Sequence, residues 1–280
     1  MSRRKVSFLA GDSRGDLILR GLALSYICLL IILPIAAIIT EAFKGDISTL
    51  WSNIMAPQAL FALKLTFLSA LIIVFINIFT GTATAWVLVR YHFPGKKIMD
   101  GLIDLPFAIP TVVTGIMLVT LYGPNSTIGS FFGKHGLEII FNKPGIVLAL
   151  LFVTFPFVVR SVQPVLLEME PDMEEAAKTL GASPLTIFRR VVLPTLIPSI
   201  LTGAALSFSR ALGEFGSIVI VAGNIPFATQ VASVYIYGEI ESYNNHGALG
   251  VSALLLFLSF LILIFLNLLQ TRSMRHERVS

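Results

Sequence analysis

Two oppositely charged side chains, Arg210 and Glu214, stand four residues apart within the otherwise apolar segment 196–221. Side chains at i and i+4 share one helix face, so the two charges can neutralise each other. Charges inside an apolar segment usually serve a function. Two interpretations stay open: a structural ion pair that fixes helix packing, or an arginine that faces a water-filled path and lowers the barrier for an anion. Gly213 belongs to the same candidate site.

A second group of polar and helix-breaking residues interrupts the apolar segment 102–122. Each of its two prolines frees a helix carbonyl, which an apolar environment tolerates only beside protein or a wet cavity. The segment is therefore either a broken helix that lines a path or a helix kinked for packing. The candidate residues of this group are Asp104, Pro106, Pro110, Thr111 and Thr114.

Metal and thiol chemistry find little support in the sequence. The four histidines are scattered without metal-ligand spacing, and Cys28 is the only cysteine. No Gly-x-x-x-x-Gly-Lys-Ser/Thr loop is present that would cradle nucleotide phosphates. We therefore expect no cofactor and no metal in this chain.

The composition requires a membrane around these residues. Of the 280 residues 55% are hydrophobic and only 13% are charged, whereas a soluble domain carries about 25% charged residues. The mean hydropathy is +0.86. A bilayer core takes about 20 apolar residues per helix. The sequence therefore predicts an all-α integral membrane protein with six transmembrane helices, at 21–40, 65–89, 102–122, 145–167, 196–221 and 248–269.

Basic residues predict the orientation of these six segments, because cytoplasmic loops are rich in Lys and Arg. Fifteen of them fall on the side of the two termini and four on the other. Both termini are therefore expected in the cytoplasm, with segment 1–20 before and tail 271–280 after a single domain at 21–270. The first segment is too long for a typical signal-peptide core and is expected to stay as an anchor. This topology accounts for the basic pI of 9.3 without a nucleic-acid partner.

The residues of the cytoplasmic loop 171–194 predict two short helices joined at a tight corner. Gly181 supplies the positive φ that ends the first helix, and Ser183 caps the second. Pro184 follows at the first helical position, where its missing N–H does no harm. The helical pair is either a docking element or an amphipathic connector on the bilayer surface.

The loop also carries a resemblance to a known family. Glu175-Ala176-Ala177, then Gly181, then Leu193-Pro194 is similar to the EAA motif of binding-protein-dependent ABC importer permeases, at the family's spacing. The resemblance implies the type I ABC importer permease fold and a coupling helix that docks in a cytoplasmic ATPase. ATP and Mg²⁺ would then be bound by that ATPase, so this chain would not be an enzyme. The implied contact residues are Glu175, Ala176, Ala177, Gly181, Ala182 and Ser183.

Three further runs resemble the oxyanion branch of this family, and above all the T-type sulfate/thiosulfate permease. They are Leu-Pro-Phe-Ala-Ile-Pro-Thr at 105–111, Phe-Pro-Phe-Val-Val-Arg at 155–160, and Ala-Leu-Gly-Glu-Phe-Gly at 211–216 with Ala-Gly-Asn-Ile-Pro at 222–226. The resemblance implies a bacterial inner membrane protein that imports sulfate or thiosulfate. Its partners would be membrane lipid, two ATPase copies, a second homologous permease of the W type, and an extracytoplasmic sulfate-binding protein.

Other functions stay open beside this resemblance. The cargo of the same kind of importer could be molybdate, tungstate or phosphate. An ATP-independent secondary anion transporter or channel would also have six spans, but it would not need the capped helical loop. A membrane-embedded enzyme would need several titratable groups at one depth. Only Arg210, Glu214 and Asp104 are available, and their pattern suggests no reaction.

Overall fold

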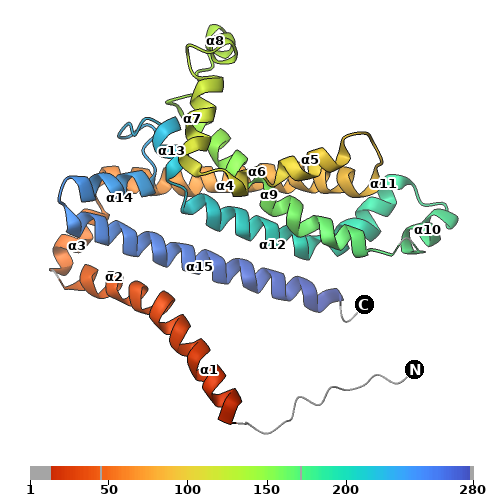
Figure 1. Cartoon of the computed structure of the whole chain (residues 1–280), viewed down its shortest axis with the longest axis horizontal. Coiled ribbons are helices and arrows are strands. Elements are labelled where there is room, and N and C mark those ends of the chain that lie inside the picture. Colours follow the sequence, from red (N-terminus) through yellow and green to blue (C-terminus); the bar gives the residue numbers. More distant parts are fainter. Residues whose placement is uncertain (1–13, 45, 171, 278–280) are drawn as a thin grey trace.

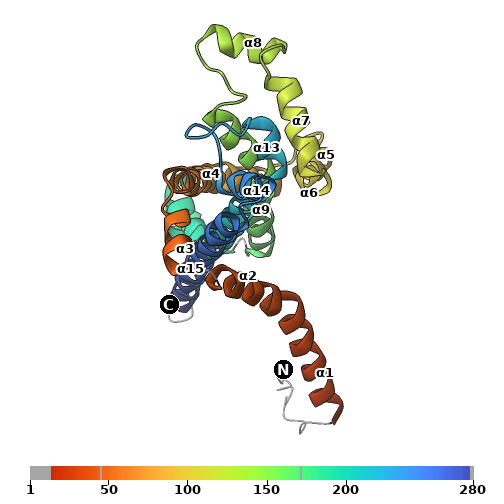
Figure 2. The same cartoon turned by 90° about the vertical axis from the view of Figure 1, so that its left-hand side faces the viewer.

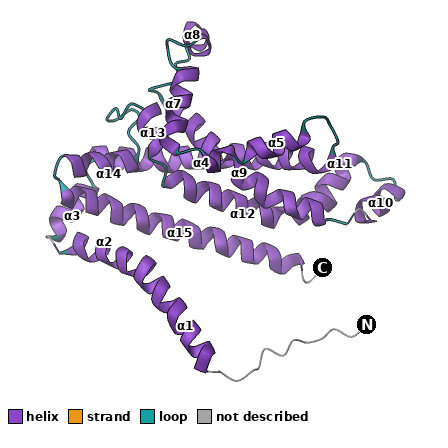
Figure 3. Cartoon of the chain, viewed as in Figure 1, coloured by secondary structure: helices purple, strands orange, loops and turns teal. Residues whose placement is uncertain are grey.

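The computed structural model describes residues 14–44, 46–170 and 172–277, and within these residues helices are joined by loops, without any strand (Figure 3). The elements in chain order are α1 (Arg14–Ile27), the π-helical turn η1 (Cys28–Ile32), α2 (Leu33–Phe43), α3 (Ile47–Ile54), α4 (Pro57–Arg90), α5 (Lys96–Ile103), α6 (Leu105–Ala108), α7 (Thr111–Tyr122), α8 (Thr127–Lys134), α9 (Lys143–Glu168), α10 (Asp172–Thr179), α11 (Pro184–Ile187), the π-helical turn η2 (Phe188–Val192), α12 (Leu193–Leu212), α13 (Gly216–Val221), α14 (Ala232–Glu241) and α15 (Asn245–Glu277).

Five helices of the described chain are long and apolar enough to cross a membrane, and a bent pair of helices makes up a sixth span. Each of these six overlaps one of the six predicted segments, so the all-α, six-span prediction is confirmed. In Figure 1, α4, α9, α12 and α15 run side by side, and α10 and the carboxyl end of α15 lie toward the same end of this bundle.

The centre of the bundle is formed by α9, which packs along both α4 and α12. Small residues allow this close approach, as is usual between helices in a membrane. A Cβ added at Gly81 of α4 would lie 2.8 Å from Val158 Cβ, and one at Gly203 of α12 would lie 2.6 Å from Val158 Cα. Both helices therefore contact α9 at Val158, and neither glycine has room for a side chain.

A buried polar chain ties the same three helices together. Asn77 Nδ2 of α4 donates to Thr154 Oγ1 of α9 at 2.8 Å, and Ser207 Oγ of α12 donates to the Thr154 carbonyl at 3.2 Å. All three residues are buried. Interhelical hydrogen bonds of this kind contribute to helix association in an apolar medium, where hydrophobic burial drives it little.

The first span stands apart from the bundle. Residues Gly15–Phe43 form one apolar helix, and none of the residues in its most apolar window is buried within the chain. It contacts α15 and α3 through α2, and α1 then diverges from the other helices (Figures 1 and 2). We call Gly15–Phe43 the N-terminal arm.

The third span is broken, as its prolines predict. Lys96–Ala108 and Thr111–Tyr122 meet at an angle of 115°. Pro110 takes an extended conformation with φ −57° and ψ 136°, and its carbonyl accepts the first hydrogen bond of α7 from Thr114 N at 3.0 Å. In Figure 2, α7 and α8 project away from the helix bundle, whereas α5 and α6 lie beside the bundle.

The fifth span departs from the prediction of one continuous helix over 196–221. Its helix begins at Pro184, because α11, η2 and α12 run on without interruption, and it ends at Leu212. The chain then turns aside through α13, and α14 lies beyond the end of α12 (Figure 1). Gly213 ends α12 and the buried Glu214 accepts from the backbone of the next helix, so both residues favour a break there.

Candidate functional site

The predicted Arg210–Glu214 pair forms, and it sits at the break between α12 and α13. Arg210 Nη2 lies 2.7 Å from Glu214 Oε2. The other carboxylate oxygen, Oε1, accepts from both N and Oγ of Ser217 at 2.8 Å. The Glu214 side chain is 1% exposed and that of Arg210 is 32% exposed. The carboxylate is thus buried and satisfied, whereas the guanidinium reaches the surface of the subunit.

Two further contacts fix the backbone around this pair. Ser233 Oγ of α14 donates to the Glu214 carbonyl at 2.7 Å. The Phe215 ring packs on Tyr237 of α14, with centroids 5.1 Å apart. The helix break is therefore held between α12 and α14, and Arg210 extends from a rigid support.

The start of α7 lies against this break. A Cβ at Gly216 would lie only 2.2 Å from Thr111 Oγ1, and one at Gly115 of α7 would lie 3.0 Å from the Ser217 carbonyl. Thr114 is buried at 2% exposure. The structure therefore brings the predicted residues Thr111 and Thr114 to the same helix pair as Glu214. Thr114 takes part in packing and does not line an open surface of the single subunit.

Asp104 lies apart from this site, in an ion cluster that the sequence reasoning missed. Arg160 of α9 donates to both carboxylate oxygens of Asp104 at 2.7 Å, and to Asp100 Oδ1 at 2.7 Å. Its third partner is Gln163. Two carboxylates share one guanidinium here, which leaves the cluster with a net charge of −1 when all three groups are ionised. Half of the Asp104 side chain remains exposed.

The signal for this cluster was present but incomplete. Asp100 and Asp104 share one helix face at i and i+4, which marks an acidic stripe. Arg160 is 56 residues from Asp104 in sequence, so only the contact between the spans could join them. From the sequence, Arg160 was a basic residue at the cytoplasmic end of its span and the last residue of the run at 155–160, without a predicted partner.

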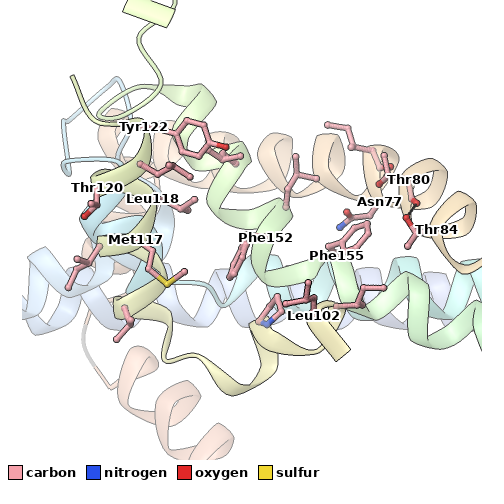
Figure 4. Close-up of a pocket in the computed structure, with 18 of the residues that line it drawn as sticks. Asn77, Thr80, Thr84, Leu102, Met117, Leu118, Thr120, Tyr122, Phe152 and Phe155 are labelled. Carbon is pink, nitrogen blue, oxygen red and sulfur yellow. Dashed lines mark hydrogen bonds between the residues drawn. The ribbon is translucent and has the colours of Figure 1, made fainter. Parts of the chain in front are cut away.

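A large apolar cavity opens between α4, the bent third span and α9. Its volume is about 1050 Å³. Pro106 lines it, whereas Pro110, Arg210 and Glu214 do not. Figure 4 shows Asn77, Thr80 and Thr84 of α4 on one side of the cavity and Met117, Leu118 and Tyr122 of α7 on the other. Asn77 Oδ1 is buried without a hydrogen-bond partner among the described residues.

The loop between α9 and α12 has the predicted corner. Gly181 has φ +80°, and Ala182 N donates to the Ala177 carbonyl at 3.0 Å. Ser183 Oγ caps α11 by accepting from Thr186 N at 3.3 Å. The second helix is not short, however, because it continues into α12 as one helix to Leu212.

One face of α10 is exposed, and its other face is partly buried. Glu175 and Ala176 are exposed, whereas Glu174 and Ala177 are partly buried. Glu174 turns inward and pairs with Arg90, the last residue of α4. The outward face of α10 thus carries the first two residues of the Glu-Ala-Ala motif, and its inward face carries a contact that the sequence did not predict.

Comparisons with known proteins agree with this architecture. Residues 77–278 match the family described as "Binding-protein-dependent transport system inner membrane component". The "Sulfate transport system permease protein CysT" of Synechocystis sp. is 44% identical over 251 residues, covering 90% of this chain and 88% of the relative. The protein of the same name from Escherichia coli is 40% identical over 252 residues, covering 90% and 91%.

Solved structures share the fold at lower identity. A bacterial ABC transporter involved in the import of alginate superposes with a TM-score of 0.75 at 17% identity, covering 92% of this chain and 96% of that chain. The same kind of transporter has been solved in complex with its alginate-bound periplasmic protein, with a TM-score of 0.74 at 18% identity, covering 92% and 95%. This fold is that of type I ABC importer permeases. The chain therefore belongs to the family of binding-protein-dependent transport system inner membrane components, and it is a multi-pass transport subunit rather than an enzyme.

Proposed function

We propose that this chain is one of two membrane-spanning subunits of an ATP-driven importer of sulfate and thiosulfate. The names of the relatives support this cargo, since they cover about nine tenths of this chain at 40–44% identity. The observation that carries the proposal within the structure is Arg210, a guanidinium that reaches the subunit surface at a helix break while a buried carboxylate holds its other side.

Arg210 suits a tetrahedral oxyanion that must pass without being trapped. A guanidinium presents several N–H donors in a planar fork that matches oxyanion geometry. Glu214 offsets its charge, so the anion meets donors without a full unopposed positive charge. Conduction needs such a compromise, because a tight site would hold its substrate.

The translocation path would run along the α12–α13 break. Arg210, Gly213 and Glu214 would form its centre. The bent third span would line it on the other side. Of the residues predicted there, Pro110 and Thr111 would stand at the path, and Pro106 would line the large cavity. The buried Thr114 would support the packing of α7, and Asp104 would stay paired with Arg160.

The loop 171–194 would connect this path to the energy source. The exposed Glu175 and Ala176, with Ala177 behind them, would contact a cytoplasmic ATPase, two copies of which would serve the two permeases. Gly181, Ala182 and Ser183 would set the corner that presents this face. ATP and Mg²⁺ would be bound by those ATPase subunits, so this chain would need no cofactor of its own.

The remaining partners follow from the same proposal. The second permease would be a homologous W-type subunit, and a sulfate-binding protein would deliver the cargo from outside the membrane. Both termini would face the cytoplasm of a bacterial cell, with segment 1–20 preceding and tail 271–280 following the domain at 21–270. The basic residues around α10 and Arg90 support this orientation.

The cargo is tested by ATP hydrolysis of the full complex in liposomes. Sulfate, thiosulfate, molybdate and phosphate are added in turn with the binding protein. We expect stimulation by sulfate and thiosulfate. Stimulation by molybdate or phosphate alone would keep the importer and overturn the cargo. Sulfate movement without ATP would instead indicate a secondary transporter or channel.

The role of Arg210 is tested by replacing it with glutamine and with lysine in the same liposomes. We expect sulfate uptake to fall about tenfold or more in Arg210→Gln, because a neutral amide gives an anion no charge to offset its desolvation. Arg210→Lys should retain part of the uptake. The amount of assembled complex is the control. Loss of assembly with unchanged uptake per assembled complex would identify the pair as structural.

A further inference from the structure

Arg90 closes α4 and joins three elements around the loop. Its Nη2 pairs with Glu174 Oε1 of α10 and lies 3.5 Å from the Met169 sulfur, just after α9. Its guanidinium carbon lies 5.3 Å from the centre of the Trp86 ring, one turn earlier on α4. The exposed fractions of the Arg90 and Glu174 side chains are 24% and 14%. The pair is thus shielded from water far more than an ordinary surface ion pair, whose net contribution is small.

The last turns of α4 also contact the part of the loop that follows the Gly181 corner. Trp86 packs edge-on against Phe188, the first residue of η2, with ring centroids 5.4 Å apart. Arg90 therefore contacts the helix before the Gly181 corner, and Trp86 contacts the helix after it. Apart from these contacts, α10 packs mainly on α11 and η2, which continue without interruption into α12.

We infer that the Arg90–Glu174 pair links α10 to α4 and carries movement of α10 into the transmembrane bundle, beside the continuous helix from α11 into α12. This inference rests on the proposed docking of the loop in an ATPase. Glu175 faces outward toward the expected partner, whereas the neighbouring Glu174 faces inward toward α4. The two adjacent acidic residues thus have different roles. Glu175 contacts the ATPase, and Glu174 transmits the displacement of α10 to α4.

The far end of this link is the region of the candidate path. α4 is a single helix of 34 residues that packs along both α9 and α12. It carries Asn77 and lines the large cavity opposite α7. A displacement of Arg90 would therefore move α4, which contacts α9 and α12. These two helices carry Arg160 and Arg210, respectively. Arg90 and Glu174 are positioning residues, because neither is expected to touch the substrate or ATP.

The decisive readout is the number of sulfate ions imported per ATP hydrolysed, measured in liposomes with the complete complex. Glu174→Gln and Arg90→Gln are compared with wild type. We expect the ATPase to copurify normally, hydrolysis to persist, and sulfate per ATP to fall about fivefold or more, the range of an ordinary coupling free energy. Exchanging the charges, with Arg90→Glu and Glu174→Arg together, should restore part of the ratio.

Two outcomes would overturn the link. An unchanged ratio in both single variants would mean that the pair transmits nothing. Loss of ATPase copurification in Glu174→Gln, equal to that in Glu175→Gln, would make Glu174 a docking residue. The control Glu175→Gln separates this inference from the proposed function: if Glu175→Gln and Gly181→Trp both leave ATPase binding and uptake intact, the loop is not the docking element and the proposed function itself fails there.

Discussion

Glu214 illustrates how a buried carboxylate can find a partner for each of its oxygens in an apolar protein interior. Burial of an unpaired charge is costly, but here both carboxylate oxygens have donors, from Arg210 on one side and Ser217 on the other. The same contacts tie the end of α12 to the start of α13. The carboxylate therefore both orients the arginine and stabilises the helix break.

Replacing Glu214 should separate these two contributions. Glu214→Ala removes the carboxylate that Arg210 and Ser217 bind, and it leaves Arg210 without its counter-charge. We therefore expect the free energy of unfolding to fall by about 3 kcal/mol or more. Glu214→Gln keeps an acceptor for Ser217 and should cost less. The thermal unfolding midpoint of the purified complex measures the difference. The exposed Glu138→Ala serves as the control, and equal midpoints for Glu214→Ala and Glu138→Ala would contradict the argument.

Sequence predicted this pair because its spacing is local. An i, i+4 relation on a helix needs no knowledge of the tertiary fold. The Arg160 cluster and the Arg90–Glu174 pair could not be predicted in this way, since their partners lie 56 to 84 residues apart. Both depend on how separate helices pack.

At the scale of elements, the close contact between α7 and α13 organises the candidate path. Gly115 of α7 and Gly216 of α13 let the two short helices approach until backbone meets backbone. The sequence did not predict the break that makes α13 a separate helix, although helices commonly end at a glycine and Gly213 stands there. The apolar character of 196–221 suggested one span and outweighed that local signal.

Gly216→Ala tests this contact against a matched neighbour. The added Cβ would lie 2.2 Å from Thr111 Oγ1 and 3.1 Å from Val112 N, so the Thr111 side chain must rotate or α7 must shift. At Gly213 a Cβ would meet nothing within 4 Å, and φ there is −92°. We expect Gly216→Ala to lower the unfolding midpoint and sulfate uptake, and Gly213→Ala to leave the midpoint nearly unchanged. Similar effects of the two substitutions would argue against a packed α7–α13 contact.

The corner at Gly181 offers a second test at this scale. Its φ of +80° is unfavourable for residues with a side chain, at about 1–2 kcal/mol, although a Cβ there would meet no neighbour. Asn tolerates this region and β-branched residues do not. We therefore expect Gly181→Asn to preserve ATPase copurification and Gly181→Val to weaken it. Equal copurification would show that the partner does not depend on this corner.

At the scale of the whole molecule, two parts lack cover within the subunit. The N-terminal arm has no buried residue in its apolar window, and α7 with α8 projects from the other side (Figure 2). Six apolar segments could be predicted from sequence because hydropathy is local. The directions of the arm and of α7 could not, since lipid and a neighbouring protein offer similar apolar surroundings.

The arm should pack on the second permease when the complex assembles. A photo-cross-linking residue at Leu24, which is 67% exposed, should yield adducts with that permease in the full complex and with lipid in the isolated subunit. The same probe at Ala62, which is fully buried, should react within the subunit in both samples. Lipid adducts alone from Leu24 in the full complex would show that the arm remains uncovered.

The 115° bend in the third span also bears on how the subunit is made. Lys96–Ala108 is about 20 Å long and α7 about 18 Å, so neither half alone reaches across a hydrocarbon core of about 30 Å. Insertion machinery selects segments by apolar length, and only the straightened segment meets that requirement. We therefore expect the nascent chain to enter the bilayer with this span unbent. Biosynthesis would then finish with a bending step, in which α7 comes to pack on α13.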